Sequence, residues 1–189
     1  MWSSHAARRF GFAIACLFAA IVPAKAEVEK FMRHCNMALC PYFHASTTVP
    51  EGWAEHKEAS AELKVQMLVP KDKTFDDAPA KIYTLVRYNP EKKPLAEIVR
   101  TTYQDWRERD KNAKVAKLAD VPGAGGKAVF ERHSFEAPKQ KEQGFELTSL
   151  TVDTDKDGNS YFVAVVLSAN SKAALNAAEA AYLSILKAY

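Results

Sequence analysis

Seven consecutive apolar residues at positions 161–167 constrain the fold more than any other segment. Side chains of a strand alternate between the two faces of a sheet, so a strand that is apolar on both faces belongs inside the sheet. Residues 145–152 are also typical of a strand, and the connection between them contains Asp157-Gly158, a favoured turn dipeptide. We therefore predict a β-hairpin with a central second strand.

Three further segments are typical of strands. Residues 82–88 are apolar on both faces and are predicted inside the sheet. Alternation of Leu63, Val65, Met67 and Val69 with polar residues predicts a half-buried strand that ends at Pro70. Residues 128–135 form a strand after a glycine-rich turn at 123–126. This turn lacks the first glycine and the final hydroxyl residue of a phosphate-binding loop.

Two amphipathic helices complete the pattern. The first follows Pro94, and its apolar stripe runs from Leu95 to Trp106 at helical spacing. The second, capped by Asn170 or Ser171, carries its stripe from Leu175 to the end of the chain. Packing against the sheet explains both stripes, so we predict an α+β domain with a central antiparallel sheet.

Residues 1–26 are typical of an export signal peptide. Arg8 and Arg9 precede an uncharged, mostly apolar run at 10–22, and Ala24 and Ala26 are small residues at the positions that a signal peptidase reads. We predict cleavage before Glu27 and a periplasmic or secreted protein. The apolar run is shorter than the roughly 20 residues of a spanning helix, so no membrane span is expected after cleavage. The general secretory and twin-arginine routes both remain open.

The charge balance changes once the signal is removed. The whole chain has 26 Lys and Arg against 23 Asp and Glu, and the signal contains three of the cations and no acid. The remaining chain is therefore neutral, and a nucleic-acid partner loses the basic surface it would need. Its length suits one domain with a hydrophobic core.

Two cysteines remain after cleavage. In an oxidising compartment, Cys35 and Cys40 are expected to form a local disulfide. The alternative is a zinc or copper site built from His34, Cys35, Cys40 and His44, which supply nitrogen and sulfur donors. The two interpretations exclude each other, because a disulfide removes both thiolates.

We find no catalytic signature in the sequence. There is no Gly-x-Ser-x-Gly motif, and acidic pairs such as Asp76-Asp77 lie in polar segments. The connection 153–159 resembles the first half of a calcium-binding EF-hand loop, but Ala164 occupies the position of the bidentate glutamate. We expect a turn there rather than a calcium site, and no cofactor.

The order of these elements resembles the PsbP-like superfamily of photosystem II subunit P and DcrB-like periplasmic proteins. The resemblance covers residues 45–189. It rests on Pro50, Gly52 and Trp53, on the stripe from Leu95 to Trp106, on Gly126 before its strand, and on the strand 161–167 followed by the last helix. It implies an antiparallel sheet flanked by helices in an α/β/α sandwich, and relatives that mostly bind partners. Residues 27–44, which contain both cysteines, lie outside it.

These observations favour an exported, non-enzymatic binding or assembly protein of the cell envelope, with another envelope protein as its partner. A periplasmic metal-binding protein that uses residues 34–44 is the first alternative. An enzyme with a dispersed site is the second. Fold alone does not choose among them.

Overall fold

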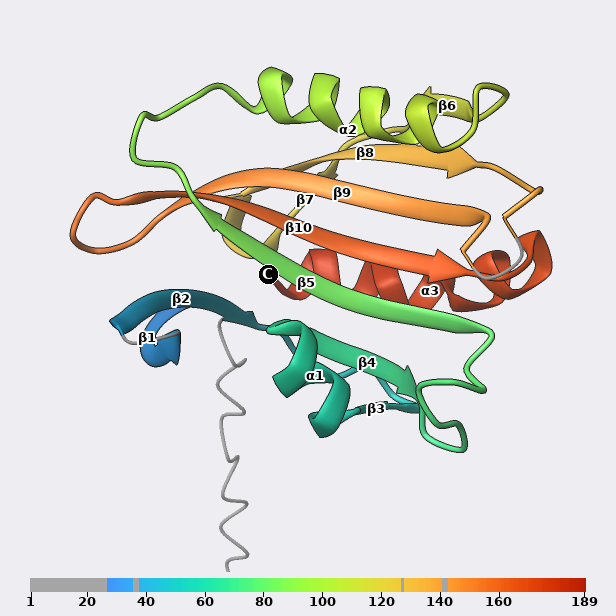
Figure 1. Ribbon diagram of the computed structural model, residues 1–189, viewed down its shortest axis with the longest axis horizontal. Helices are drawn as coiled ribbons and strands as arrows, with labels where there is room; N and C mark the ends of the chain where they lie inside the picture. The colour runs from blue at the N-terminus through green and yellow to red at the C-terminus, as the bar shows by residue number, and fades with distance from the viewer. Residues whose placement is uncertain (1–26, 36–37, 127, 141–142) are drawn as a thin grey trace, which may run out of the picture.

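The computed structural model describes residues 27–35, 38–126, 128–140 and 143–189, with the backbone alone described at 27, 33–35 and 38–41. An eight-stranded antiparallel sheet dominates the fold (Figure 1). Its main path runs β3 (Trp53–Glu55), β4 (Gln66–Pro70), β5 (Ala80–Tyr88), β10 (Ser160–Ala169), β9 (Phe145–Thr154), β8 (Val129–Glu136) and β6 (Lys114–Lys117). The short β7 (Val121–Pro122) also pairs with β8.

The predicted central hairpin is confirmed. Strand β10 pairs with β9 on one side and with β5 on the other, both antiparallel. The glycine-rich turn also behaves as predicted, since Gly125 and Gly126 have φ angles of 68° and 67°, which side chains rarely tolerate. The α+β fold with a central antiparallel sheet is therefore confirmed.

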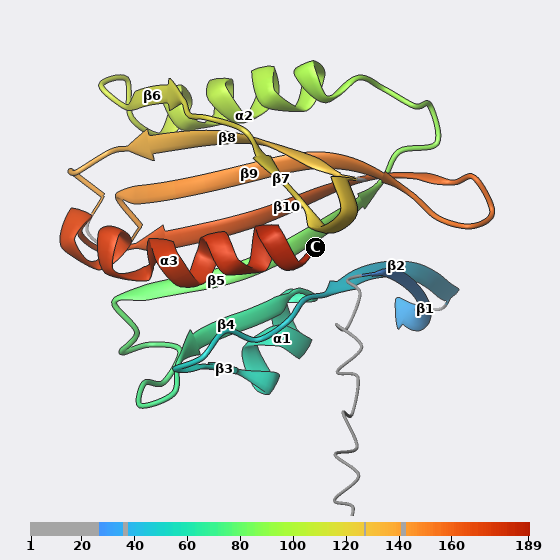
Figure 2. The same cartoon turned by 180° about the vertical axis from the view of Figure 1, so that it is seen from behind.

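In the described part of the chain, three α-helices flank this sheet. Helices α1 (Lys57–Leu63) and α2 (Leu95–Arg109) lie on one face, and α3 (Lys172–Ala188) lies on the other (Figures 1 and 2). The strand register explains this division. Ile82, Leu167 and Leu147 occupy paired positions in three strands and face α3, whereas the next residue along each strand faces the other side.

Helix α3 closes its face of the sheet. Ser171 caps the helix by accepting the Ala174 N–H at 3.2 Å, which decides between the two predicted caps. The helix buries Leu175, Ala178, Tyr182, Ile185 and Leu186 in the main core. Beneath it, the hydroxyls of Tyr182 and Ser149 lie 2.5 Å apart, so the buried polar groups satisfy each other.

A separate two-stranded hairpin precedes the sheet. It consists of β1 (Glu27–Cys35) and β2 (Ala38–Ser46). Phe43 packs against Tyr88 and Tyr161 with ring centroids 5.4 and 5.0 Å away. This aromatic cluster joins the hairpin to strands β5 and β10.

One sequence prediction was wrong in detail. The alternation that begins at Leu63 indicated a strand, but Leu63 ends helix α1 and Lys64 adopts a left-handed conformation at its C-cap. The strand begins only at Gln66, whose buried amide accepts hydrogen bonds from the Thr47 N–H and hydroxyl at 2.7 Å. Strand β4 is buried on both faces, because Met67 packs with Ala59 of α1 on one face and Leu68 belongs to the main core on the other. The short edge strand β6 was also not predicted.

Candidate ligand-binding cleft

A cleft of about 180 Å³ lies between α2 and the sheet, on the face opposite α3. Strands β5, β9 and β10 form its floor, and one face of α2 forms its wall. Of the fifteen residues of α2, only Trp106 is buried. Most of the helix therefore stands away from the sheet, which leaves the cleft beneath it.

The centre of the floor is apolar. Ala164 of β10 pairs with Leu85 of β5 and with Leu150 of β9, and Phe162 and Val166 lie on either side of it in the same strand. A methyl group at the middle position leaves room that a larger side chain would fill. Leu85 is 37% exposed, so this apolar floor is open to solvent.

One end of the cleft is polar and contains a buried acid. Glu146 is only 8% exposed, and the Thr148 hydroxyl donates a hydrogen bond to its Oε1 at 2.5 Å. Burial raises the pKa of Glu146, while the Thr148 hydrogen bond, the Arg109 charge and the Trp106 indole act in the opposite direction. The cleft is therefore lined at this end by a poorly solvated carboxyl group.

Trp106 fixes the wall above that acid. Its ring stacks on Phe135 of β8 at 5.1 Å, and the Arg109 guanidinium lies 5.7 Å from the centroid of the Trp106 ring. Asp105 and Arg109 line the cleft, and neither forms an ion pair with another described residue. Two charged groups at the rim thus accompany the buried one.

The predicted disulfide and signal-cleavage sites fall largely outside the described side chains. Ala24 and Ala26 lie outside the described residues, and Glu27 is described only as the first backbone position of β1. The backbone register pairs Cys35 with Ala38 and Cys40 with Arg33. Because the side chains of both cysteines lie outside the described ones, the disulfide stays a prediction.

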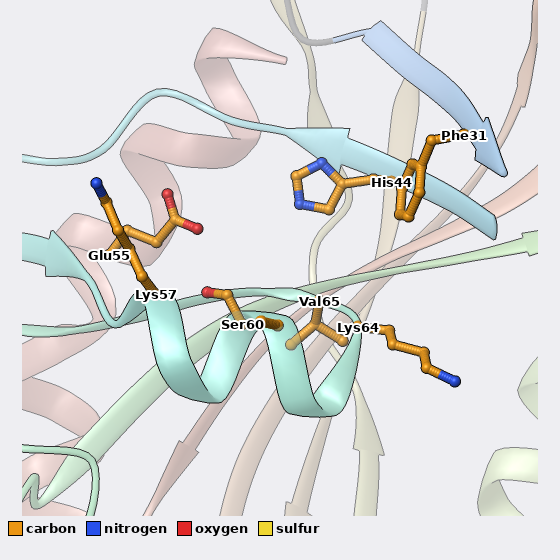
Figure 3. A pocket seen from close by; sticks show the side chains of 8 residues that line it. Phe31, His44, Glu55, Lys57, Ser60, Lys64 and Val65 are labelled. Atoms are coloured by element: carbon orange, nitrogen blue, oxygen red, sulfur yellow. The ribbon is translucent and has the colours of Figure 1, made fainter. Parts of the chain in front are cut away.

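Of the four candidate metal ligands, only His44 has a described side chain. Figure 3 shows His44 beside Phe31 at a second cavity of about 270 Å³, across from Ser60 of α1 and from Val65, which follows that helix. The His44 Nδ1 lies 3.2 Å from the Ser46 hydroxyl. Among the described side chains, no three His, Cys, Asp or Glu residues are grouped to hold a metal. His34, Cys35 and Cys40 are described by backbone alone, so the metal site stays a hypothesis.

The two other histidines among the described residues have structural contacts. His56 caps α1, where its Nδ1 accepts the Ala59 N–H at 3.2 Å. His133 is buried in β8, with its Nδ1 2.7 Å from the Tyr103 hydroxyl of α2. Its Nε2 lies 3.3 Å from Glu131 Oε1 without hydrogen-bond geometry, and burial lowers its pKa. His133 therefore helps to hold α2 over β8.

The connection between β9 and β10 is organised around the carboxylate of Asp155. One oxygen accepts the N–H groups of Asp157 and Asn159, and the other accepts the Asn159 amide and the Tyr161 hydroxyl, all at 2.7 to 2.9 Å. These bonds lower the pKa of Asp155 to about 2. Asp155, which would coordinate calcium in an EF-hand loop, thus already accepts hydrogen bonds within the loop at both carboxylate oxygens.

Sequence reasoning missed the residues that define the cleft. Glu146 and Thr148 lie in a segment that was recognised as a strand, and a glutamate inside such a strand is the one signal that could have drawn attention to them. The wall residues of α2 were recognised as part of an amphipathic helix. The cleft between these residues and the sheet results from tertiary packing, which the helical pattern does not reveal.

No protein-family model matches the chain, and no curated protein matches it. Separately, within the described residues no helix has both the length and the apolar character needed to cross a membrane.

Proposed function

We propose that this chain is an exported, non-enzymatic binding protein of the cell envelope, and that the cleft beneath α2 is its binding site. The observation that carries the proposal is an apolar floor that ends at the buried carboxyl of Glu146. An apolar pocket with a few convergent polar groups is the usual form of a small-molecule site.

The size of the cleft limits the ligand. A cavity of about 150 Å³ holds a benzene molecule. The cleft, at about 180 Å³, therefore suits one ring or a short branched chain with a small polar head. The apolar part would cover Leu85, Leu150 and Ala164, and the head would lie near Glu146.

The cellular role rests on the sequence. The export signal gives the envelope location, and the absence of a catalytic motif favours binding over chemistry. An envelope protein that delivers or receives the ligand is the proposed partner. The relationship to the PsbP-like superfamily also remains a proposal, and it rests on the order of elements and the residues given above.

Direct binding of 2-phenylethanol, an uncharged one-ring compound, tests the site. Trp106 lines the cleft, so its fluorescence reports binding in a Trp53→Phe background, where it is the remaining tryptophan of the chain after signal removal. We expect saturable binding with Kd on the order of 1 mM for a compound of this size.

A matched pair of variants localises that binding. Ala164→Leu fills the centre of the floor and should abolish binding, whereas Ala96→Leu places the same added volume at an exposed position of α2 and should not affect it. Circular dichroism would show that both variants remain folded. Binding that survives Ala164→Leu, or no binding by the parent protein, would contradict the proposed site.

A further inference from the structure

We infer that the ligand of this cleft carries a protonated amine, which binds at the end formed by Glu146, Asp105 and the last turn of α2. This inference rests on the proposed function, because it assigns the chemical class of ligand to the same cleft. It comes from how the charges are distributed along the cleft.

The polar end favours a cation. Two acidic side chains, Glu146 and Asp105, line it with one cationic side chain, Arg109. The last turn of α2 also lines this end through Trp106 and Arg109. Carbonyl groups at a helix C-terminus carry partial negative charge, which favours a cation nearby. A ligand ammonium would thus meet more negative than positive charge.

The opposite end discourages the same cation. Arg87 of β5 lines the cleft beside Phe162, with which it pairs in the sheet register. Phe162 pairs in turn with Val152 of β9, six residues along the strand from Glu146. At about 3.3 Å per residue, the two ends of the cleft are far enough apart for their charges to orient a ligand. The amine would point to Glu146, and the apolar body would lie over Ala164 and Leu150.

Arg109 does not make the polar end a carboxylate site. Its guanidinium is already placed over the Trp106 ring, and its charge acts on Glu146. A ligand carboxylate would approach Arg109 only together with Glu146 and Asp105, which repel it. An ammonium would instead be attracted by both acidic side chains, and it would add a second positive charge, besides that of Arg109, beside the buried Glu146 carboxylate.

Three compounds with the same aromatic body test the inference: 2-phenylethylamine, 2-phenylethanol and 3-phenylpropionate. Each is titrated at neutral pH against the Trp53→Phe protein, with Trp106 fluorescence as the readout. We expect the amine to bind about tenfold more tightly than the alcohol, as for a charge-assisted hydrogen bond. The carboxylate should bind no better than the alcohol.

Variants that remove the negative charges identify their contribution. Glu146→Gln and Asp105→Asn should each reduce the preference for the amine over the alcohol, measured as the ratio of the two Kd values. Glu108→Gln makes the same chemical change as Glu146→Gln on the exposed side of α2, outside the cleft, and should leave both Kd values unchanged. Asp105 is exposed, so its replacement tests the charge even if the buried position tolerates no change.

The possible outcomes separate this inference from the proposed function. Equal binding of amine and alcohol, or tightest binding of the carboxylate, would overturn the amine inference and leave the site in place. Binding of the amine that Glu146→Gln and Asp105→Asn both leave unchanged would also overturn it. If none of the three compounds binds, the proposed function fails as well.

Discussion

The two faces of the sheet are covered by helices of similar length and amphipathic character, yet only one face is closed. Helix α3 buries five residues against the strands, whereas α2 buries Trp106 alone. The relative sizes of the facing side chains explain the difference. On the α3 side, the small helix residue Ala178 belongs to the same buried cluster as Val163, Val165 and Leu167 of the sheet, and small residues let a helix pack closely.

The arrangement is reversed on the α2 side. There the helix contributes the large aromatic Trp106, which stacks on Phe135, and the middle of the floor contributes Ala164. A large residue at one end of the helix and a small one below its middle leave a space between them. The closed face therefore stabilises the fold, and the open face contains the cleft that we propose as the binding site.

The largest expected effect is a difference in stability between matched isoleucine truncations on the two helices. Ile185 of α3 is 1% exposed, so Ile185→Ala leaves a cavity in a packed core and should cost about 2–5 kcal/mol. Ile98 of α2 is partly exposed above the cleft, so Ile98→Ala should cost much less, within about 1 kcal/mol. Urea denaturation of both variants measures the two values.

Equal losses of stability from these two truncations would contradict the difference between the two faces, because they would mean that α2 packs as closely as α3 in solution. Hydrogen exchange sharpens the result. Amides in the N-terminal half of α2 should exchange faster than those in the middle of α3, since fewer buried contacts hold them.

Some features of the two sheet faces could be predicted from the sequence, and others could not. The continuous apolar run 161–167 identified the central strand, because every side chain there must be buried on one face or the other. The apolar stripes identified α2 and α3. The periodicity of apolar residues shows which side of a helix faces the sheet. The distance between helix and sheet depends on contacts such as that of Trp106 with Phe135, which only folding brings together.

Short elements were harder to predict for a related reason. Helix α1 has seven residues, too few for a helical periodicity to stand out, and it is fixed by the His56 cap and by packing of Ala59 with Met67. Glu146 shows the same limit at the candidate site. Its position in a strand was evident, but its burial beside Trp106 and Arg109 depends on where α2 lies.

A smaller effect is expected from the acid beneath α2, and it depends on pH. The pKa of Glu146 is raised above its ordinary value of 4.5, so the folded state binds this proton more tightly than the unfolded state. The resulting stabilisation is fully present below pH 4.5 and is lost as the pH rises through the raised pKa. Glu146→Gln should remove this loss, so the variant should gain stability relative to the parent as the pH rises.

Thermal unfolding from acidic to neutral pH measures that difference, with Glu108→Gln as a control that should follow the parent at every pH. A Glu146→Gln variant whose Tm differs from the parent by the same amount at all pH values would contradict the raised pKa. It would also show that the α2 face is better hydrated than an apolar cleft with a buried acid.

The smallest effect is expected at the exposed loop between β9 and β10, which positions Tyr161 for the aromatic cluster that joins the N-terminal hairpin to the sheet. Asp155→Asn replaces the oxygen that accepts hydrogen bonds from Tyr161 and the Asn159 amide. Because the pKa of Asp155 is lowered from 3.8 to about 2, its contribution should be complete above pH 3.8 and lost as the pH falls towards 2. The difference in Tm between parent and variant should therefore be constant at neutral pH and shrink in acid. Asp157→Asn, in the same loop, should show no such change.

The same loop should not bind calcium. Millimolar calcium should not raise the Tm of the parent protein, because the Asp155 oxygens already accept hydrogen bonds within the loop. A calcium-dependent rise that Asp155→Asn abolishes would show that the loop binds the ion and that this end of the sheet has a second site besides the cleft.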